Sequence, residues 1–395
     1  MGVTVRHEWH PVVELTEIKQ VTGRLYYNRH RKKWQCIVEC GKDADGRRRQ
    51  IFRDARTKAE ARQILQKLLR ELEDGTHVEQ HNLTVAEYLR TYIAEHARHT
   101  CSARTVESMG YMVERHLVPA LGAHRLMDLR PLHLQRYYSA KIDSGLSPTT
   151  VRKHHNTIHV MLRHAVRMQL LALNPADAVV APRVVHKEMN FLEAKQSATL
   201  LRQLEGTSLH LPVLLALGTG MRRGELLALC WCDIDLDGRT LVVARTLEEA
   251  FGTVSTKQPK TGKSRRRITL PGILVDALRV ERAKQAEKTL ASQPDDDRSD
   301  VVLRAPNGRP WRPAAFDRAW RRFKRNNGIP VRFHDLRHSH ASQLLVAGVH
   351  VKVVSERLGH ASVGITLDVY SHVIPALQEE AAEKIDAGLR AALSG

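Results

Sequence analysis

The sequence predicts a multidomain protein: a small α+β domain at the N-terminus, an all-α domain in the middle, and a mainly α (α+β) domain that completes the chain. Three observations lead to this prediction. The chain has 395 residues, more than one hydrophobic core normally serves. Its hydrophobic pattern alternates near the start, is helical in the middle and is mixed afterwards. A stretch rich in Pro, Ala and charge, residues 174–188, is typical of a linker.

The first domain, residues 1–75, is expected to hold a small sheet and one helix. GRLYYNRHRKKWQCIVEC and RRRQIFR are typical of strands, and DADG (43–46) is typical of a turn. A helix is expected from Thr57, which forms a capping-box pattern with Glu60, to Leu72. The sheet carries basic side chains that favour contact with a DNA groove, the alternative being a solvated hairpin. These candidates are Arg31, Lys32, Lys33, Arg47, Arg48 and Arg49.

The second domain, residues 82–180, is predicted to be helical throughout, with breaks at PALGAHRL, SGLSP and LNPAD. The helix expected from Pro148 to Leu171 has one apolar face. Its other faces carry candidates for phosphate contact, Arg152, Lys153 and Arg163. His155 and His159 have the spacing of a metal pair. No carboxylate lies within the helix to complete a site, so phosphate contact or solvation is the favoured interpretation.

Composition indicates the class of partner. The formal charge of +19 and the pI near 10.0 favour a polyanion, and nucleic acid is the commonest. Aromatic residues make up only 5%, which favours duplex DNA over stacked single strands. Five cysteines argue against a disulfide framework and for a reducing cytoplasm. No signal peptide and no apolar run of membrane-spanning length is recognised.

The third domain, residues 189–395, mixes helices with the expected strands RTLVVART and SRRRITL and ends in an amphipathic helix over 376–393. Its candidate reactive side chains lie at helix starts, turns and helix ends. Arg222 heads a helix, Lys260 lies in a hairpin turn, His334 and Arg337 are spaced i, i+3, His360 follows a helix end, and Tyr370 comes ten residues later, after an expected loop.

Together these side chains match the requirements of one reaction. Attack on a phosphodiester calls for paired guanidinium groups to bind the phosphate, which Arg222 and Arg337 supply. It also calls for a nucleophile and for a proton donor to the departing alkoxide, a role open to Lys260. A tyrosine hydroxyl, whose ordinary pKa is about 10, needs neighbouring cations or a base, and His334 and His360 meet that need.

The ordered motifs TGMRRGE, PKTGKS, HDLRH, LGHAS and TLDVYSH resemble those of the tyrosine recombinase family, which includes phage and conjugative-transposon integrases. The resemblance spans nearly the whole chain. It implies an arm-type DNA-binding domain over 1–75, a core-binding DNA-binding domain over 82–180, and a tyrosine recombinase catalytic domain with a C-terminal helix tail over 189–395. It further implies a metal- and ATP-independent DNA strand transferase that needs no cofactor.

The resemblance also implies a role for each candidate. Arg222 and Arg337 bind the scissile phosphate, Lys260 is the general acid toward the 5′ hydroxyl, His334 and His360 assist, Glu225 supports the site, and Tyr370 forms a 3′-phosphotyrosyl bond. Lys257 and Lys263 lie in the same hairpin, but PKTGKS aligns Lys260 with the family pattern. Arg223 is a neighbour that the Thr-Gly-x-Arg spacing passes over. His340 and His372 are interpreted as scaffold or DNA contacts.

The implied partners are duplex DNA attachment sites of core and arm type, a DNA-bending host factor and an excision factor. The implied assembly is a monomer when free and a homotetramer in the synaptic complex, in the cytoplasm at the nucleoid. The helix over 376–393 is expected to dock on a neighbouring protomer, the alternative being its own domain.

Other functions remain open at this point. They are a chromosome-dimer-resolving recombinase, a type IB topoisomerase, and a non-catalytic regulator that uses LLVAGVHVKVVSERLGH as a helix-turn-helix. The basic N-terminal domain argues against the first, and the ordered reactive side chains argue against the last.

Overall fold

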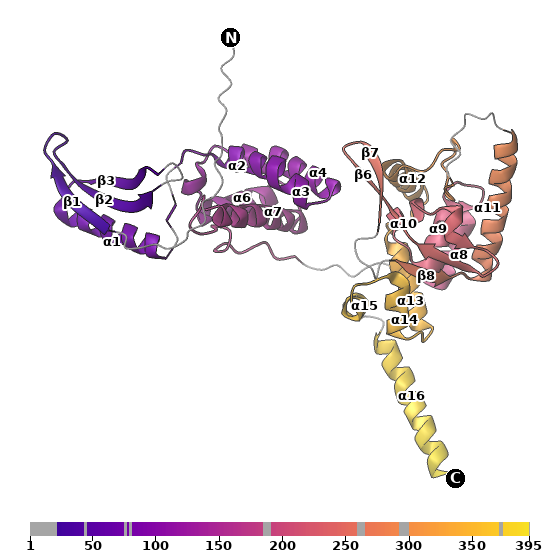
Figure 1. Ribbon diagram of the computed structural model, residues 1–395. Helices are drawn as coiled ribbons and strands as arrows, with labels where there is room; N and C mark the ends of the chain where they lie inside the picture. Colours follow the sequence, from indigo (N-terminus) through magenta and orange to yellow (C-terminus); the bar gives the residue numbers. More distant parts are fainter. Residues whose placement is uncertain are drawn as a thin grey trace. The chain divides into compact units, whose positions relative to one another are not determined.

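The computed structural model describes residues 22–42, 46–74, 77–78, 81–184, 191–258, 265–291, 300–370 and 374–394. The chain divides into two compact units, Met1–Val184 and Val185–Gly395. Figure 1 shows the elements of both.

The N-terminal part is a three-stranded antiparallel sheet with one helix packed against it (Figure 1). Its elements are β1 (Thr22–Asn28), β2 (Lys33–Lys42), β3 (Arg48–Ala55) and α1 (Lys58–Glu73). Alternate residues of β2 and β3 face the helix, so Cys36, Val38 and Ile51 are buried with Leu68. This arrangement confirms the expected sheet and helix, while residues 43–45 of the expected turn lie outside the described residues.

The start of α1 follows the predicted cap. The Thr57 side chain accepts a hydrogen bond from the backbone N–H of Glu60 at 3.2 Å, and the Glu60 carboxylate accepts one from the N–H of Arg56 at 2.8 Å. Both bonds satisfy backbone donors that have no partner within the helix.

The second part of this unit is all helical, as predicted. Its helices are α2 (Val85–Thr91), η1 (Tyr92–Ala97), α3 (Arg98–Thr100), α4 (Ala103–Met112), η2 (Val113–Leu117), α5 (Val118–Leu121), η3 (Leu126–Asp128), α6 (Pro131–Asp143) and α7 (Pro148–Arg167). One hydrophobic core joins them, with Leu89, Leu117, Leu134 and Ile158 fully buried.

Two boundaries differ from the expectation for this part. Helix α7 ends at Arg167 rather than near Leu171, because Gln169 adopts a left-handed backbone with φ of 57°. The expected linker also begins too early. Asn174 and Ala176 are buried, and the Asn174 side chain donates to the carbonyl of His159 at 3.2 Å, so these residues belong to the helical core.

The second unit combines helices with short strands. Its helices are α8 (Ala194–Leu204), α9 (His210–Thr219), α10 (Arg223–Leu227), η4 (Trp231–Asp233), α11 (Gly272–Ala291), α12 (Pro313–Asn326), α13 (Asp335–Val346), α14 (Val351–Leu358), α15 (Val363–Tyr370) and α16 (Ile374–Leu393). Its strands are β4 (Ile234–Asp235), β5 (Thr240–Val243), β6 (Thr246–Ala250), β7 (Thr253–Lys257) and β8 (Arg266–Thr269).

The strands form a sheet in the order β4-β5-β8 and a separate hairpin of β6 and β7. Strands β5 and β8 were predicted, but the hairpin of β6 and β7, which turns at residues 251–252, was not. The hairpin turn expected at Lys260 lies outside the described residues. Glu249 ties the hairpin to α12, since its carboxylate accepts from the Arg312 guanidinium and from the N–H of Ala314, each at 2.8 Å. A large core under these elements includes Leu215, Leu226 and Phe316.

The stretch before Tyr370 was expected to be a loop, and this expectation is wrong. Residues Val363–Tyr370 form the helix α15, and Thr366 within it is buried. The apolar residues of GITLDVY favour this outcome, because burial offsets the low helix propensity of Thr and Val. Tyr370 therefore ends a helix, and its side chain lies outside what the structure describes.

No helix in the described ranges is long and apolar enough to cross a membrane.

Candidate functional site

Arg222 is fixed where α9 passes into α10. It is the N-cap residue of α10, and its backbone N–H donates to Glu225 Oε2 at 2.9 Å. Its guanidinium donates from Nη1 to Glu225 Oε1 at 2.9 Å and from Nη2 to the carbonyl of Gly359 at 3.2 Å. Glu225 is buried, whereas the Arg222 side chain is 40% exposed. Arg222 is thus held at its base and remains open to a ligand.

Arg337 is held more deeply, on α13. Its side chain is buried, and it donates from Nη1 to the carbonyl of Gly220 and from Nη2 to that of Leu358, both at 2.7 Å. Gly220 has φ of +66°, and a Cβ there would lie 2.6 Å from the ring of His340. Only glycine allows the chain to bring this carbonyl to Arg337.

His334 is the N-cap residue of α13 and is exposed. Partial desolvation by its surroundings, followed by the charge of Arg337, lowers the pKa of His334. His360 is half-buried, and its Nδ1 lies 2.8 Å from Thr366 Oγ1. Burial, and then the charges of Arg337 and Arg222, lower the pKa of His360 to about 4. Both imidazoles are therefore neutral near pH 7.

These four candidates come together around one short segment. Leu358 accepts from Arg337, Gly359 accepts from Arg222, and His360 follows directly. His334 is close enough to both arginines for their charges to lower its pKa. Residues distant in sequence, from the motifs TGMRRGE, HDLRH and LGHAS, thus form one basic site.

Of two further candidates, Tyr370 is placed in part and Lys260 is not placed. Tyr370 ends α15, four residues after Thr366, which contacts His360. Lys260 and Lys263 lie outside the described residues, as does His372. Lys257 ends β7 and forms an ion pair with Glu248.

Two basic residues next to these candidates, Arg223 and His340, are held by other partners. Arg223 forms an ion pair with Asp317 of α12. His340 is buried, with Nδ1 2.7 Å from the carbonyl of Leu217, and its Nε2 accepts from Arg357 Nε at 3.1 Å. These contacts fix the tautomer of His340, which donates from Nδ1 and accepts at Nε2.

We expect the buried His340 to make the stability of this unit depend on pH. Burial, and then Arg357, lower the pKa of His340 from 6.5 to about 4, and Arg337 adds to the shift. The unfolded chain therefore binds more protons between these values, so the free energy of unfolding falls as pH drops from about 6.5 towards 4. Thermal unfolding should show a lower midpoint at pH 5 than at pH 7.

The variant His340→Gln keeps a donor and an acceptor but has no charge to gain. Its unfolding midpoint should fall less between pH 7 and pH 5 than that of the wild type. The remaining dependence comes from His338 and His360, whose pKa values are also lowered to about 4, and from His334, whose pKa is lowered as well. An equal fall in both proteins contradicts the assignment.

Arg266 is a site residue that the sequence did not single out. It is buried on β8 and donates to both carboxylate oxygens of Glu225, from Nη2 at 2.9 Å and from Nη1 at 3.2 Å. His338 was also missed; its ring lies 5.2 Å from that of His334. The signal for Arg266 was strand alternation, since Ile268 is an inward residue two positions along.

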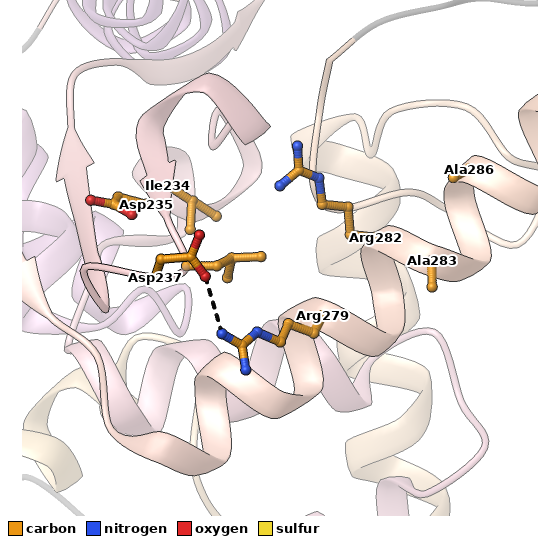
Figure 2. A pocket seen from close by; sticks show the side chains of 8 residues that line it. Ile234, Asp235, Asp237, Arg279, Arg282, Ala283 and Ala286 are labelled. Carbon is orange, nitrogen blue, oxygen red and sulfur yellow. Dashed lines mark hydrogen bonds and ion pairs between the residues drawn. The ribbon is translucent and has the colours of Figure 1, made fainter.

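Two cavities open on this unit. One has a volume of about 630 Å³ and is lined by Arg222 and His334 together with Arg321, Lys324 and Arg332. The other, shown in Figure 2, has a volume of about 500 Å³ and lies between the β4–β5 turn and α11. There Arg279 pairs with Asp237 at 3.3 Å (Figure 2). The second cavity contains no candidate residue.

The basic DNA candidates are mostly exposed. In the sheet, Arg31, Lys32 and Lys33 lie at the β1–β2 turn, and Arg47, Arg48 and Arg49 lead into and begin β3. On α7, Lys153 and Arg163 are exposed, while the half-buried Arg152 donates from Nε to the carbonyl of Pro182 at 2.9 Å.

Two guanidinium groups and two imidazoles beside a helix that ends in tyrosine are the groups expected in an enzyme that acts on phosphodiesters. Residues 189–376 match the model of the phage integrase family, and residues 84–142 match that of the phage integrase N-terminal SAM-like domain. The two matches together cover more than half of the chain. The chain belongs to the phage integrase family of tyrosine recombinases.

Curated relatives of this chain are named integrases or tyrosine recombinases. An integrase of Streptomyces ambofaciens is 29% identical over 371 residues, covering 90% of this chain and 94% of the relative. The ICEBs1 integrase of Bacillus subtilis (strain 168) is 27% identical over 336 residues, covering 84% and 90%. A tyrosine recombinase XerC-like protein of Caldanaerobacter subterraneus subsp. tengcongensis is 27% identical over 384 residues, covering 91% and 97%.

Solved structures share the fold. The Tn1549 transposon integrase in complex with a circular intermediate DNA has a TM-score of 0.64 at 18% identity, covering 75% of this chain and 99% of that chain. A lambda integrase tetramer bound to a Holliday junction has a TM-score of 0.55 at 19% identity, covering 86% and 95%.

Proposed function

We propose that this chain is a site-specific DNA recombinase that integrates and excises a mobile element by cleaving and rejoining duplex DNA through a 3′-phosphotyrosyl bond. One observation carries the proposal: Arg222, Arg337, His334 and His360 converge around the carbonyls of residues 358 and 359. Two fixed guanidinium groups match the non-bridging oxygens of one phosphate.

The reaction follows from these groups. Arg222 and Arg337 bind the scissile phosphate and stabilise the charge that develops during attack. The Tyr370 oxygen forms a bond to phosphorus, and the bond to the 5′ oxygen breaks. The neutral His334 and His360 can hydrogen-bond the phosphate, and His334 can accept the tyrosine proton, whereas a pKa of about 4 makes His360 a weak base. The phosphotyrosyl bond conserves the energy of the broken phosphodiester, so rejoining needs no ATP.

We assign to Lys260 the role of proton donor for the departing 5′ oxygen. The ion pair of Lys257 with Glu248 supports this choice, because an ion pair with a carboxylate makes it harder for a lysine to lose its proton. The PKTGKS motif favours Lys260 over Lys263.

The cavity beside Arg222 and His334 is suited to the DNA backbone next to the scissile phosphate. Arg321, Lys324 and Arg332 line it, and they come from α12 and from the segment before α13. Such phosphate contacts fix the register of a protein on DNA without reading sequence.

The N-terminal sheet is proposed to bind arm-type sites, and the helical part core-type sites. The exposed Arg47, Arg48 and Arg49, together with the basic β1–β2 turn, support the first assignment. The exposed Lys153 and Arg163 of α7 support the second.

Deletion of residues 1–75 is expected to spare cleavage of a core site and to impair recombination of full attachment sites. A second linked DNA-binding module raises effective affinity by about 10²-fold or more, and this gain is lost on deletion. Recombination of full and core-only plasmid substrates measures the difference. Unchanged recombination of the full site removes the case for arm binding.

We propose a homotetramer as the active assembly and a monomer as the form without DNA. The exposed Ile385, Leu389 and Leu393 of α16 support docking of this helix on a neighbouring protomer. A DNA-bending host factor and an excision factor complete the proposed assembly, at the nucleoid in the cytoplasm.

A chromosome-dimer-resolving recombinase is the second candidate function, since one curated relative is XerC-like by name. The basic sheet and α1 that precede the helical part favour the integrase. Recombination that requires an arm site separates the two functions.

The experiment that tests the proposal uses a suicide substrate nicked next to the cleavage site. Incubation without ATP and with a metal chelator should give a covalent protein–DNA adduct that survives denaturing electrophoresis. A chain that binds the site and gives no adduct is not a recombinase of this kind.

A further inference from the structure

Glu225 lies between two guanidinium groups of different exposure. On one side is Arg222, whose side chain is 40% exposed, and on the other is Arg266, whose side chain is 6% exposed. Arg222 reaches the carboxylate through its backbone N–H and through Nη1, each at 2.9 Å. Arg266 reaches the same two oxygens at 3.2 and 2.9 Å. One carboxylate is thus shared by an inner and an outer arginine.

Arg266 is itself fixed by the backbone. Its Nε donates to the carbonyl of Arg357 at 2.6 Å. A Cβ on Gly359 would lie 3.0 Å from its Nη1, and the carbonyl of that same glycine accepts from Arg222. The 357–359 segment therefore contacts both arginines, and the inner one cannot shift without disturbing the outer one.

Glu225 has two cationic partners among the described residues. Two guanidinium groups share the Glu225 carboxylate, and the more exposed of them, Arg222, is where a phosphate can meet positive charge. Without Arg266, Arg222 is the one partner that the described part of the chain offers Glu225. A buried carboxylate with a single cationic partner holds it tightly and cancels its charge.

We propose that Arg266 is a positioning residue that neutralises and orients Glu225. Because of this, Arg222 keeps its positive charge and stays oriented toward the scissile phosphate. The inference rests on the proposed function.

The electrostatics of Glu225 agree with this role. Burial raises the pKa of this carboxyl, but the hydrogen bonds and charge of Arg266, followed by those of Arg222, outweigh burial and lower it. Both arginines therefore favour the ionised form of the carboxylate.

The test measures two quantities on the whole chain with the suicide substrate: the dissociation constant for core-site DNA and the single-turnover rate constant for adduct formation. Arg266→Met should lower the rate constant by about 100-fold, the usual cost of losing one charge-stabilising donor, and change binding less than about threefold. The matched control is Arg267→Met on the same strand, where the side chain is exposed. It should cleave at the wild-type rate.

The double variant Glu225→Gln with Arg266→Met separates this role from a structural one. It removes the carboxylate that Arg266 neutralises, so Arg222 keeps its charge, and the rate constant should recover at least about tenfold over Arg266→Met. The double variant also leaves no unpaired buried charge. It should therefore fold even if Arg266→Met alone does not fold. In that case its rate should lie within about tenfold of the wild type.

Three results overturn the inference. They are an unchanged rate in Arg266→Met, a folded double variant no faster than Arg266→Met, and a folded double variant more than about 100-fold slower than the wild type. The wild-type reaction keeps the two hypotheses apart, because a missing wild-type adduct contradicts the proposed function, whereas a normal one with these results contradicts only the role of Arg266.

Discussion

Tyr370→Phe is expected to abolish the covalent adduct while leaving DNA binding within about twofold of the wild type. Phenylalanine has the same ring without the oxygen that must bond to phosphorus, so no partial reaction through this residue remains. The measurement is adduct formation on the suicide substrate, together with binding to the same DNA without a nick.

The control is Tyr111→Phe, which removes the hydroxyl of an exposed tyrosine on α4, far along the chain from the catalytic motifs. It should form adduct at the wild-type rate. An adduct that persists in Tyr370→Phe shows that another residue is the nucleophile, and peptide mapping of that adduct would identify it.

Arg337→Ala is expected to slow adduct formation by about 10³-fold or more, the range seen when a guanidinium that stabilises a phosphoryl transition state is lost. Arg337→Lys should recover little of this. A lysine cannot donate to the carbonyls of Gly220 and Leu358 together and still face the phosphate, as the planar fork of arginine can. Binding of core-site DNA should change far less than the rate, because many other basic residues contact the backbone.

Arg222→Ala is expected to behave in the same way. A suitable control is Arg279→Ala, whose side chain pairs with Asp237 at the second cavity. Variants of Arg222 or Arg337 that bind poorly but cleave all bound DNA at the wild-type rate would show that these residues supply affinity rather than catalysis.

The candidate site could be predicted from the sequence where a side chain lies next to a local signal. Arg222 follows a Thr-Gly turn, His334 and Arg337 share the start of a helix, and His360 follows a helix-ending glycine. In each case the local backbone preference and the reactive side chain are neighbours in sequence. The structure confirms that these residues come together, although their catalytic roles stay predictions.

The inner arginine could not be chosen in the same way. SRRRITL offers three consecutive arginines, and composition treats them alike. Strand alternation places Arg266 on the same face as Ile268 and Arg267 on the other, but nothing local shows that the inward arginine meets a carboxylate. Its partner Glu225 is 41 residues earlier, and no local pattern connects the two.

The predicted boundaries of helices and linker were wrong where tertiary contacts outweigh helix propensity. The α15 region contains Gly, Thr and Val, which are poor helix formers, yet Thr366 is buried there against His360. The early part of the expected linker has the Pro and Ala content of a connection, but Asn174 and Ala176 pack into the helical core. The composition of a segment therefore does not show which of its residues are buried, because packing against the rest of the fold decides that.

The hydrogen bond between Thr366 and His360 has a mechanical consequence. Thr366 and Tyr370 are one turn apart on α15, so they lie on the same side of the helix. If α15 is displaced, the imidazole loses its Nδ1 partner at the same moment as the tyrosine leaves its place. A displacement of α15 therefore acts at once on both residues, the proposed nucleophile Tyr370 and its proposed assisting group His360, because one helix holds the partner of the imidazole and the tyrosine.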